Sequence, residues 1–222
     1  MLLPFVYQTE TGMPAPACYD VLYAHKQKGL KKPITQWTLD EIEADGPRRT
    51  RENGSSAAGA YQFMRDTLDK PGTLQDIEGE MGLTGKEIFS PSLQDRMAYH
   101  LLKRRGYAAF MSGKITRNEF AKNLAQEWAS FPVLVPMKGS SRWINRGQSY
   151  YAGDGANKSL VKPEQLETIL DAVLKAGNSI PTPAPVKQVS WLFVAFGILV
   201  AVGAAFWGWL SAIPCNLFNL FC

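Results

Sequence analysis

The acidic residue Glu10 has a setting that suits acid–base chemistry. It lies in the N-terminal segment Tyr7-Gln8-Thr9-Glu10-Thr11-Gly12, and apolar residues precede it at Leu2, Leu3, Phe5 and Val6. Burial among apolar side chains raises the pKa of a carboxyl group, so that it holds a proton near neutral pH and can donate it. The sequence therefore predicts Glu10 as a general acid. The alternative interpretation is an exposed glutamate near the chain end.

A second carboxylate would decide which reaction such an acid supports. Asp20 is the candidate, because it follows Glu10 by ten residues. Enzymes that cleave glycosidic bonds commonly pair two carboxyl groups. Glu52, in Arg51-Glu52-Asn53-Gly54, is the second candidate for the acid, although a position in a turn is the simpler interpretation of that residue.

The run Ser56 to Gln62, S-A-A-G-A-Y-Q, has the composition of a ligand-binding loop. Its small residues, among them Ser56 and Gly59, allow a ligand to approach the backbone closely. Tyr61 offers a flat apolar face with a hydroxyl group, and Gln62 offers a donor and an acceptor. These four residues are predicted to bind a substrate rich in hydroxyl and N-acetyl groups. The alternative is a helix N-terminus packed closely on its neighbour.

Several segments match known motifs in their order along residues 5 to 176. The run at 56–62 resembles the S-[ST]-A-G-R-Y-Q signature of phage endolysins related to the lambda lytic transglycosylase, with Ala60 in place of the usual arginine. Further segments are similar to motifs of the same family: Tyr19-Asp20-Val21-Leu22, Thr38-Leu39-Asp40-Glu41-Ile42, Phe89-Ser90-Pro91-Ser92-Leu93-Gln94-Asp95, Glu127-Trp128-Ala129-Ser130-Phe131-Pro132, and the stretch from Gly147 to Lys158.

The resemblance implies a mainly α (α+β), lysozyme-like fold with a small β-hairpin lobe. It implies an enzyme that cleaves the β-1,4 bond between N-acetylmuramic acid and N-acetylglucosamine, and it adds Trp128 and Tyr150 to the expected substrate-binding residues. If Asp20 positions water, the enzyme is a hydrolase. If the sugar's own 6-hydroxyl attacks, it is a lytic transglycosylase that leaves an anhydro product. The alternative of another class is a non-catalytic wall-binding or virion structural protein.

Helices are expected to position these residues. Capping patterns and proline place helix starts at Thr38, Thr84, Ser90, Thr116 and near Pro163, the helix after Ser90 ending before Gly106 and the last one before Gly177. The irregular stretch from Thr11 to Lys32 is expected to form the hairpin lobe.

The C-terminal part has a different composition. Residues 191–212 are almost purely apolar, with Trp191 at one end and Trp207 and Trp209 near the other, as in a transmembrane helix. The predicted organisation is a peptidoglycan-cleaving domain at 1–177, a Pro-rich linker at 178–190, the transmembrane helix at 191–212 and a short tail at 213–222. The first seven residues are too short for a secretion signal.

Cysteine and histidine are sparse, which argues against a metal site, and no metal or organic cofactor is expected. Cys215 and Cys222 either pair or remain free thiols, and Cys18 is the third cysteine. No basic stripe with interleaved aromatic residues indicates nucleic-acid binding.

The expected partners are bacterial peptidoglycan, a lipid bilayer through residues 191–212, and other virion membrane or lysis proteins. The expected location is a phage virion membrane or the host inner membrane. Lys175 and Lys187 precede the apolar segment, which favours an interior position of the domain until lysis or wall penetration.

Overall fold

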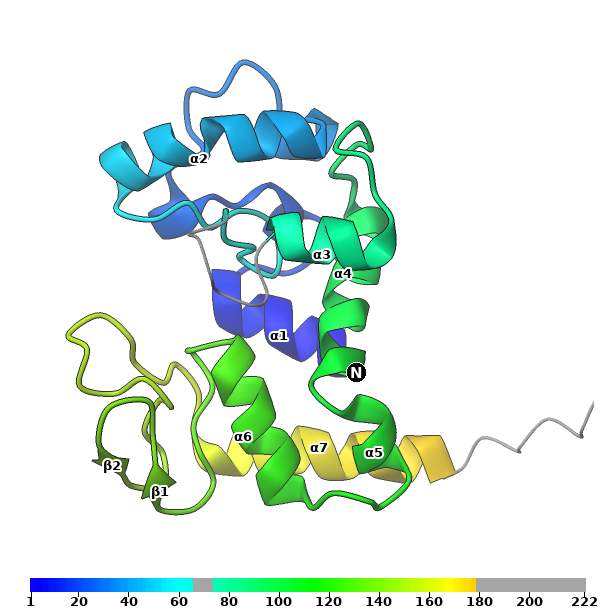
Figure 1. Ribbon diagram of the computed structural model, residues 1–222, viewed down its shortest axis with the longest axis vertical. Helices are drawn as coiled ribbons and strands as arrows, with labels where there is room; N and C mark the ends of the chain where they lie inside the picture. Colours follow the sequence, from blue (N-terminus) through cyan, green and yellow to red (C-terminus); the bar gives the residue numbers. More distant parts are fainter. Residues whose placement is uncertain (66–73, 179–222) are drawn as a thin grey trace, which may run out of the picture. The chain divides into compact units, whose positions relative to one another are not determined.

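A computed structural model of the protein describes residues 1–65 and 74–178 (Figure 1). These residues are mainly helical, and they include one two-stranded antiparallel sheet. The α-helices are α1 (Leu2–Thr11), α2 (Leu39–Asn53), α3 (Leu74–Met81), α4 (Pro91–Arg104), α5 (Tyr107–Met111), α6 (Arg117–Glu127) and α7 (Pro163–Asn178). The strands are β1 (Met137–Lys138) and β2 (Trp143–Ile144), and the 3-10 turns are η1 (Ala17–Asp20), η2 (Tyr23–His25) and η3 (Ile34–Gln36).

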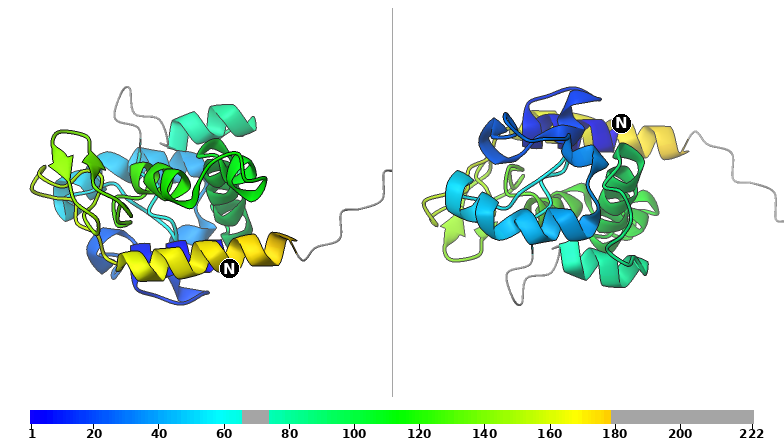
Figure 2. Two further views of the ribbon diagram at one scale, coloured as in Figure 1. Left: turned by 90° about the horizontal axis from the view of Figure 1, so that it is seen from below. Right: turned by 90° about the horizontal axis from the view of Figure 1, so that it is seen from above.

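Helix α1 lies between two groups of elements. Figure 1 shows α2 and α3 above it, and α5, α6, α7 and the sheet below it. Helix α4 contacts α1, α3 and α5 and so connects the two groups, while α7 lies alongside α1 in both views of Figure 2. A residue at the end of α1 is therefore close to both groups.

The apolar core is continuous through both groups. Val6 of α1 is fully buried, and in the same core Phe110 of α5 and Phe120 of α6 stack with their ring centroids 4.6 Å apart. Burial of one such side chain contributes about 1.5–3 kcal/mol to the free energy of unfolding, so packing in this core holds α1 in place.

Local capping explains where several helices begin. Thr38 and Glu41 form the complete capping box of α2, Ser90 caps α4 with Pro91 in its first turn, and Thr116 accepts the Glu119 N–H at the start of α6. These predicted starts are confirmed. Helix α7 runs to Asn178 and so passes the predicted stop before Gly177.

The prediction of a helix at Thr84 is wrong. The carboxylate of Glu87 does accept the Thr84 N–H, at 3.0 Å from Oε2, but no helix follows. Gly85 has φ +81°, and α4 begins at Pro91, so the intervening chain is too short for a helix of its own. Half of a capping box has formed within a turn.

The expected hairpin lobe also differs from the structure. The stretch from Thr11 to Lys32 contains the 3-10 turns η1 and η2 in place of a hairpin. Pro14 and Pro16 lack the N–H groups that a strand ladder needs. Within the described residues, the two-stranded sheet lies instead at 137–144, where Met137 pairs with Ile144 and Lys138 with Trp143.

Nothing in the described part of the chain is a helix both long and apolar enough to cross a membrane. The predicted transmembrane segment 191–212, the tail at 213–222 and all of the linker after residue 178 lie outside the described residues. Cys215 and Cys222 lie there as well.

Candidate active site

Glu10 lies in the last turn of α1. The helix ends at Gly12, which has φ 67° and donates its N–H to the Gln8 carbonyl oxygen at 2.9 Å. Glycine adopts this left-handed conformation without a Cβ penalty, which makes it the usual residue for ending a helix. The Thr11-Gly12 pair therefore ends the helix directly after Glu10 and places the carboxyl group in the last turn.

The carboxyl group of Glu10 is desolvated and accepts a side-chain hydrogen bond. The hydroxyl of Ser130 donates a hydrogen bond to Glu10 Oε1. Burial raises the pKa of Glu10 from its ordinary 4.5 to about 7, and the Ser130 hydrogen bond lowers it in part. The negative end of the helix dipole also disfavours a carboxylate there. Glu10 as a residue remains partly exposed, so this setting gives a proton donor near neutral pH that is not sealed off.

The segment that carries Ser130 is anchored on several sides. Trp128 Nε1 donates to the Tyr61 carbonyl oxygen at 3.3 Å, and Leu160 N donates to the Ser130 carbonyl oxygen at 2.8 Å. The ring of Phe131 stacks on Phe5 of α1, with centroids 5.6 Å apart. The segment 128–132 thus connects α1, the loop at 56–62 and the chain before α7.

The loop at 56–62 is a tight turn that requires glycine. Ala58 and Phe63 exchange backbone hydrogen bonds of 3.0 and 2.9 Å, and Gly59 between them has φ +79°. A Cβ on Gly59 would lie 2.4 Å from Gln94 Oε1 and 2.8 Å from a Phe89 ring carbon. Glycine is needed here for its conformation and because the protein itself fills the space.

Gln94 of α4 holds this turn in place. Its side chain is fully buried, accepts the Ala60 N–H at 2.8 Å, and donates to the carbonyl oxygens of Tyr19 and Phe89 at 3.1 and 3.0 Å. Because buried polar groups must be satisfied, the three contacts fix the relative positions of three segments.

The neighbouring Asp95 anchors two tyrosines. Its Oδ1 accepts hydrogen bonds from the hydroxyl groups of Tyr19 at 2.9 Å and Tyr61 at 2.6 Å. Burial, and after it the hydrogen bond to Asp95, raises the pKa of the Tyr61 phenol, which therefore remains a donor. Both rings also contact Tyr7, one turn before Glu10 on α1.

Asp20 has a structural contact at the end of η1. Its Oδ1 accepts the backbone N–H of Thr35 at 2.9 Å, which joins η1 to η3. The chain after Asp20 runs beside the 56–62 loop, because Val21 O accepts the Gly59 N–H at 2.8 Å and Tyr23 N donates to Ala57 O at 3.1 Å.

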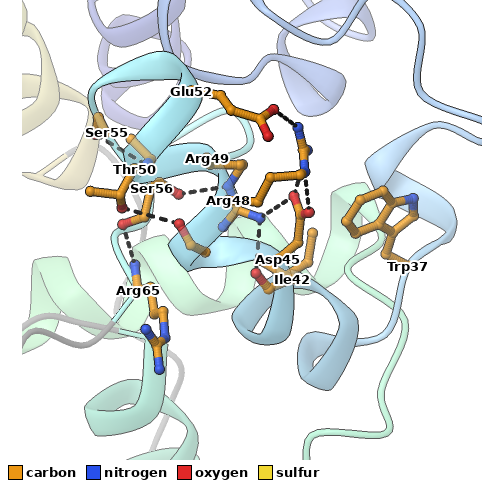
Figure 3. Close-up of polar contacts among 12 residues, drawn as sticks. Trp37, Ile42, Asp45, Arg48, Arg49, Thr50, Glu52, Ser55, Ser56 and Arg65 are labelled. Carbon is orange, nitrogen blue, oxygen red and sulfur yellow. Dashed lines mark hydrogen bonds and ion pairs between the residues drawn. The ribbon is translucent and has the colours of Figure 1, made fainter.

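A buried arginine of α2 supports the loop from the other side (Figure 3). Arg49 is fully buried, and its guanidinium donates to the Ser56 carbonyl oxygen at 3.0 Å, to the Ile42 carbonyl oxygen at 2.9 Å and to Asp45 Oδ2 at 3.0 Å. Asp45 also binds Arg48 through both carboxylate oxygens, at 2.7 and 2.9 Å. The pairing with Asp45 compensates the buried charge of Arg49.

Three predicted substrate-binding residues are buried in the structure. Tyr61 is 1% exposed and Trp128 is 4% exposed, so neither ring presents a face to a sugar. Ser56 is buried, and its hydroxyl accepts the Arg65 N–H at 3.0 Å. Apolar rings at a tight turn gain more from core packing than from exposure, which explains the difference.

Gln62 and Tyr150 are partly exposed, as a binding role requires. Gln62 has φ 50°, and its side-chain amide donates to the Gly59 carbonyl oxygen at 2.9 Å. Tyr150 packs edge-on against Tyr151, with ring centroids 5.2 Å apart. Glu52, the second candidate acid, lies on the exposed side of α2 and pairs with Arg48 at 2.7 Å.

Ser130, Gln94, Asp95 and Arg49 were not assigned roles from the sequence. The first three lie inside motifs that the sequence does reveal, and the contacts that give them roles join residues 34 to 120 positions apart. In the parts of the chain that the structure describes, no group of three or more acidic, histidine or cysteine residues is arranged to hold a metal ion. Cys18 is buried, and burial raises the pKa of its thiol to about 11.

Comparison with known proteins identifies a family. The model of a protein family described as Endolysin matches residues 16–157, which is more than half of the chain. The match includes the 56–62 loop, Gln94, Asp95 and Ser130, and it begins after Glu10. Neither the curated proteins nor the solved structures give a match.

Proposed function

The chain belongs to the Endolysin family of phage enzymes that degrade peptidoglycan, and we propose that it is a muramidase with Glu10 as its general acid. The scissile bond is the β-1,4 linkage between N-acetylmuramic acid and N-acetylglucosamine. The observation that carries the proposal is the desolvated Glu10 carboxyl, which is hydrogen-bonded by Ser130 and has a pKa of about 7. Such a group is protonated often enough near neutral pH to protonate a leaving glycosidic oxygen.

The contacts of the candidate site support this assignment. The motifs that surround Glu10 are linked by hydrogen bonds: Trp128 to the backbone of Tyr61, Gln94 to Ala60, and Asp95 to Tyr19. A rigid framework of this kind preserves the orientation of a reacting group, which matters because small misplacements slow catalysis strongly.

Asp20 bears on the reaction type. Its Oδ1 already accepts the Thr35 N–H, and this tether favours a structural role over activation of water. We therefore favour the transglycosylase route, in which the 6-hydroxyl of the sugar attacks and an anhydro product forms. Hydrolysis with Asp20 as the second carboxylate is the alternative.

Product analysis separates the two routes. Digested peptidoglycan is examined by mass spectrometry, because an anhydro product lacks the water that a hydrolytic product contains. Asp20→Asn keeps an oxygen acceptor for Thr35 but removes the charge. We expect anhydro products and a small loss of rate. Products with reducing ends, together with a loss on the scale of ~10²–10⁴-fold in Asp20→Asn, would establish hydrolysis instead.

A non-catalytic wall-binding protein is the alternative of another class. A zymogram on bacterial wall material distinguishes it, because an enzyme clears the embedded wall and a binding protein does not. Clearing by the wild type that is absent in Glu10→Gln supports the proposal. Wall binding without clearing by the wild type would contradict it.

We also propose that residues 191–212 anchor the enzyme in a phage virion membrane or the host inner membrane. The segment is almost purely apolar and about as long as a bilayer-spanning helix needs to be. The test is carbonate extraction of membranes from expressing cells, with a chain truncated after residue 180 as the control. Full-length protein in the membrane pellet and truncated protein in the supernatant are expected. Release of the full-length protein would contradict the anchor.

The proposal also includes the side of the membrane on which the domain lies before lysis or wall penetration. Lys175 and Lys187 favour an interior position before lysis or wall penetration. Protease added to sealed spheroplasts should therefore leave the domain intact until the membrane is opened. Digestion from outside before lysis would contradict this orientation.

A further inference from the structure

Ser130 is a buried residue whose hydroxyl group is used at the candidate site and not in its own loop. It is 7% exposed, and within residues 1–65 and 74–178 its hydroxyl donates to Glu10 Oε1. Its backbone is held independently, because its carbonyl oxygen accepts the Leu160 N–H at 2.8 Å and the next residue donates its N–H to the Trp128 carbonyl oxygen at 3.0 Å. The backbone position of Ser130 is therefore set by the loop and not by the contact with Glu10.

The same loop is also fixed against the helix that carries Glu10. Phe131 follows Ser130 and stacks on Phe5, which lies five residues before Glu10 on α1. Phe131 also contacts the ring of Trp128, with centroids 6.1 Å apart. These aromatic contacts hold the segment that carries Ser130 against the helix that carries Glu10.

A glutamate at the end of a helix has three side-chain torsions, and a single orientation delivers its proton to a given oxygen atom. A fixed donor on one carboxyl oxygen removes most other orientations and leaves the second oxygen to carry the proton. We propose that Ser130 is the positioning residue for Glu10, and that its hydroxyl fixes the carboxyl group in the orientation that donates a proton to the substrate. This inference rests on the proposed function of Glu10.

The proton transfer is consistent with a positioning role for Ser130. The O–H bond of the neutral Glu10 breaks as an O–H bond forms on the leaving glycosidic oxygen, which also takes the electron pair of the broken C–O bond. Glu10 is then a carboxylate, and the hydrogen bond from Ser130 stabilises its charge. On the favoured route the anomeric carbon forms its new C–O bond with the 6-hydroxyl oxygen of the same sugar, and the proton of that hydroxyl passes to the Glu10 carboxylate. Ser130 itself neither gains nor loses a proton.

The test is the titration of Glu10 in Ser130→Ala, followed by NMR of the ¹³C-labelled carboxyl group in the full-length protein in detergent, with Glu10→Gln to assign the signal. Loss of a donor to the charged form should raise the midpoint by about one pH unit. The alkaline limb of the activity profile should move upward with it, and kcat should fall by about tenfold with little change in KM. Ser130→Thr, which keeps the hydroxyl, should restore the wild-type midpoint.

Ser149→Ala is the matched control. Ser149 is 1% exposed, and its hydroxyl accepts the Tyr151 N–H at 3.3 Å, whereas the hydroxyl that bonds Glu10 in the described part of the chain is that of Ser130. Its removal should leave the Glu10 midpoint unchanged. The inference is overturned if Ser130→Ala leaves the midpoint in place, or if Ser149→Ala moves it as far.

The positioning role of Ser130 and the proposed function can be refuted separately, because the NMR titration tests the first and the glycan assay tests the second. A wild type that cuts no glycan refutes the proposed function, even when the midpoint moves as expected. A wild type that cuts glycan, with a Glu10 midpoint insensitive to Ser130, refutes the positioning role alone.

Discussion

Replacement of Glu10 by glutamine should stabilise the protein above neutral pH while it removes activity. The folded state raises the pKa of Glu10 to about 7 from 4.5, because the carboxyl group is desolvated. A negative charge at this position therefore destabilises the folded protein. Glutamine has nearly the same shape and can still hydrogen-bond to Ser130, but it never becomes charged.

The size of the effect follows from the difference between the two pKa values. At 1.36 kcal/mol per pH unit, a difference of about 2.5 units corresponds to roughly 3 kcal/mol. Because the pKa of Glu10 is higher in the folded than in the unfolded state, its contribution to the free energy of unfolding is fully present below pH 4.5. This contribution is lost as the pH rises to about 7. Glu10→Gln should therefore match the wild type near pH 4.5, and its advantage should reach the full value above pH 7.

The assay is thermal unfolding of full-length wild type and Glu10→Gln in the same detergent between pH 4.5 and 9. For a domain of this size, about 3 kcal/mol corresponds to a rise in Tm of roughly 6–12 °C. An offset in Tm that does not change with pH would refute the reasoning, as would a variant less stable than the wild type at pH 8. Either result would mean that burial of the Glu10 carboxylate does not lower the free energy of unfolding.

Glu78 offers a matched comparison, because burial, and after it the nearby charges of Glu43, Asp40 and Glu87, raises its pKa to about 7 as well. Glu78→Gln should raise Tm at pH 8 and keep wall-degrading activity. A loss of activity comparable to that of Glu10→Gln would show that removing a buried carboxylate affects activity even outside the candidate site. Gly59→Ala should destabilise by about 2 kcal/mol or more in thermal unfolding, because a Cβ there meets Gln94 and Phe89 as well as an unfavourable φ. Gly54→Ala shares the positive φ of +87° but has no atom within 4 Å of its Cβ, so it should cost about 1–2 kcal/mol; equal losses in the two variants would argue against the close contact at Gly59.

Features that depend on nearby residues could be predicted from the sequence. Thr38, Ser90 and Thr116 cap helices through residues three positions away, as predicted. The order of the motifs correctly indicated the family. Each of these signals requires a short window or a fixed order of segments.

Contacts between distant segments could not be predicted. Nothing in the spacing of the chain indicates that the Ser130 hydroxyl reaches Glu10, or that Gln94 fills the space above Gly59. For the same reason the sequence did not reveal that neighbouring residues bury the rings of Tyr61 and Trp128, which were predicted to bind substrate. Burial is a property of the assembled core, so a motif identifies these residues but leaves their exposure open.

The central claim is that Glu10 delivers the proton that cleaves the glycan strand, and glycan release by Glu10→Gln tests it most directly. Purified peptidoglycan is digested at pH 6 by wild type, Glu10→Gln and the exposed-site control Glu52→Gln, and the released muropeptides are quantified by mass spectrometry. The account predicts fragments cut between N-acetylmuramic acid and N-acetylglucosamine with intact stem peptides. It also predicts that Glu10→Gln releases them at least ~10²-fold more slowly, while Glu52→Gln keeps the wild-type rate. Full release by Glu10→Gln, or its loss in Glu52→Gln alone, would contradict the account.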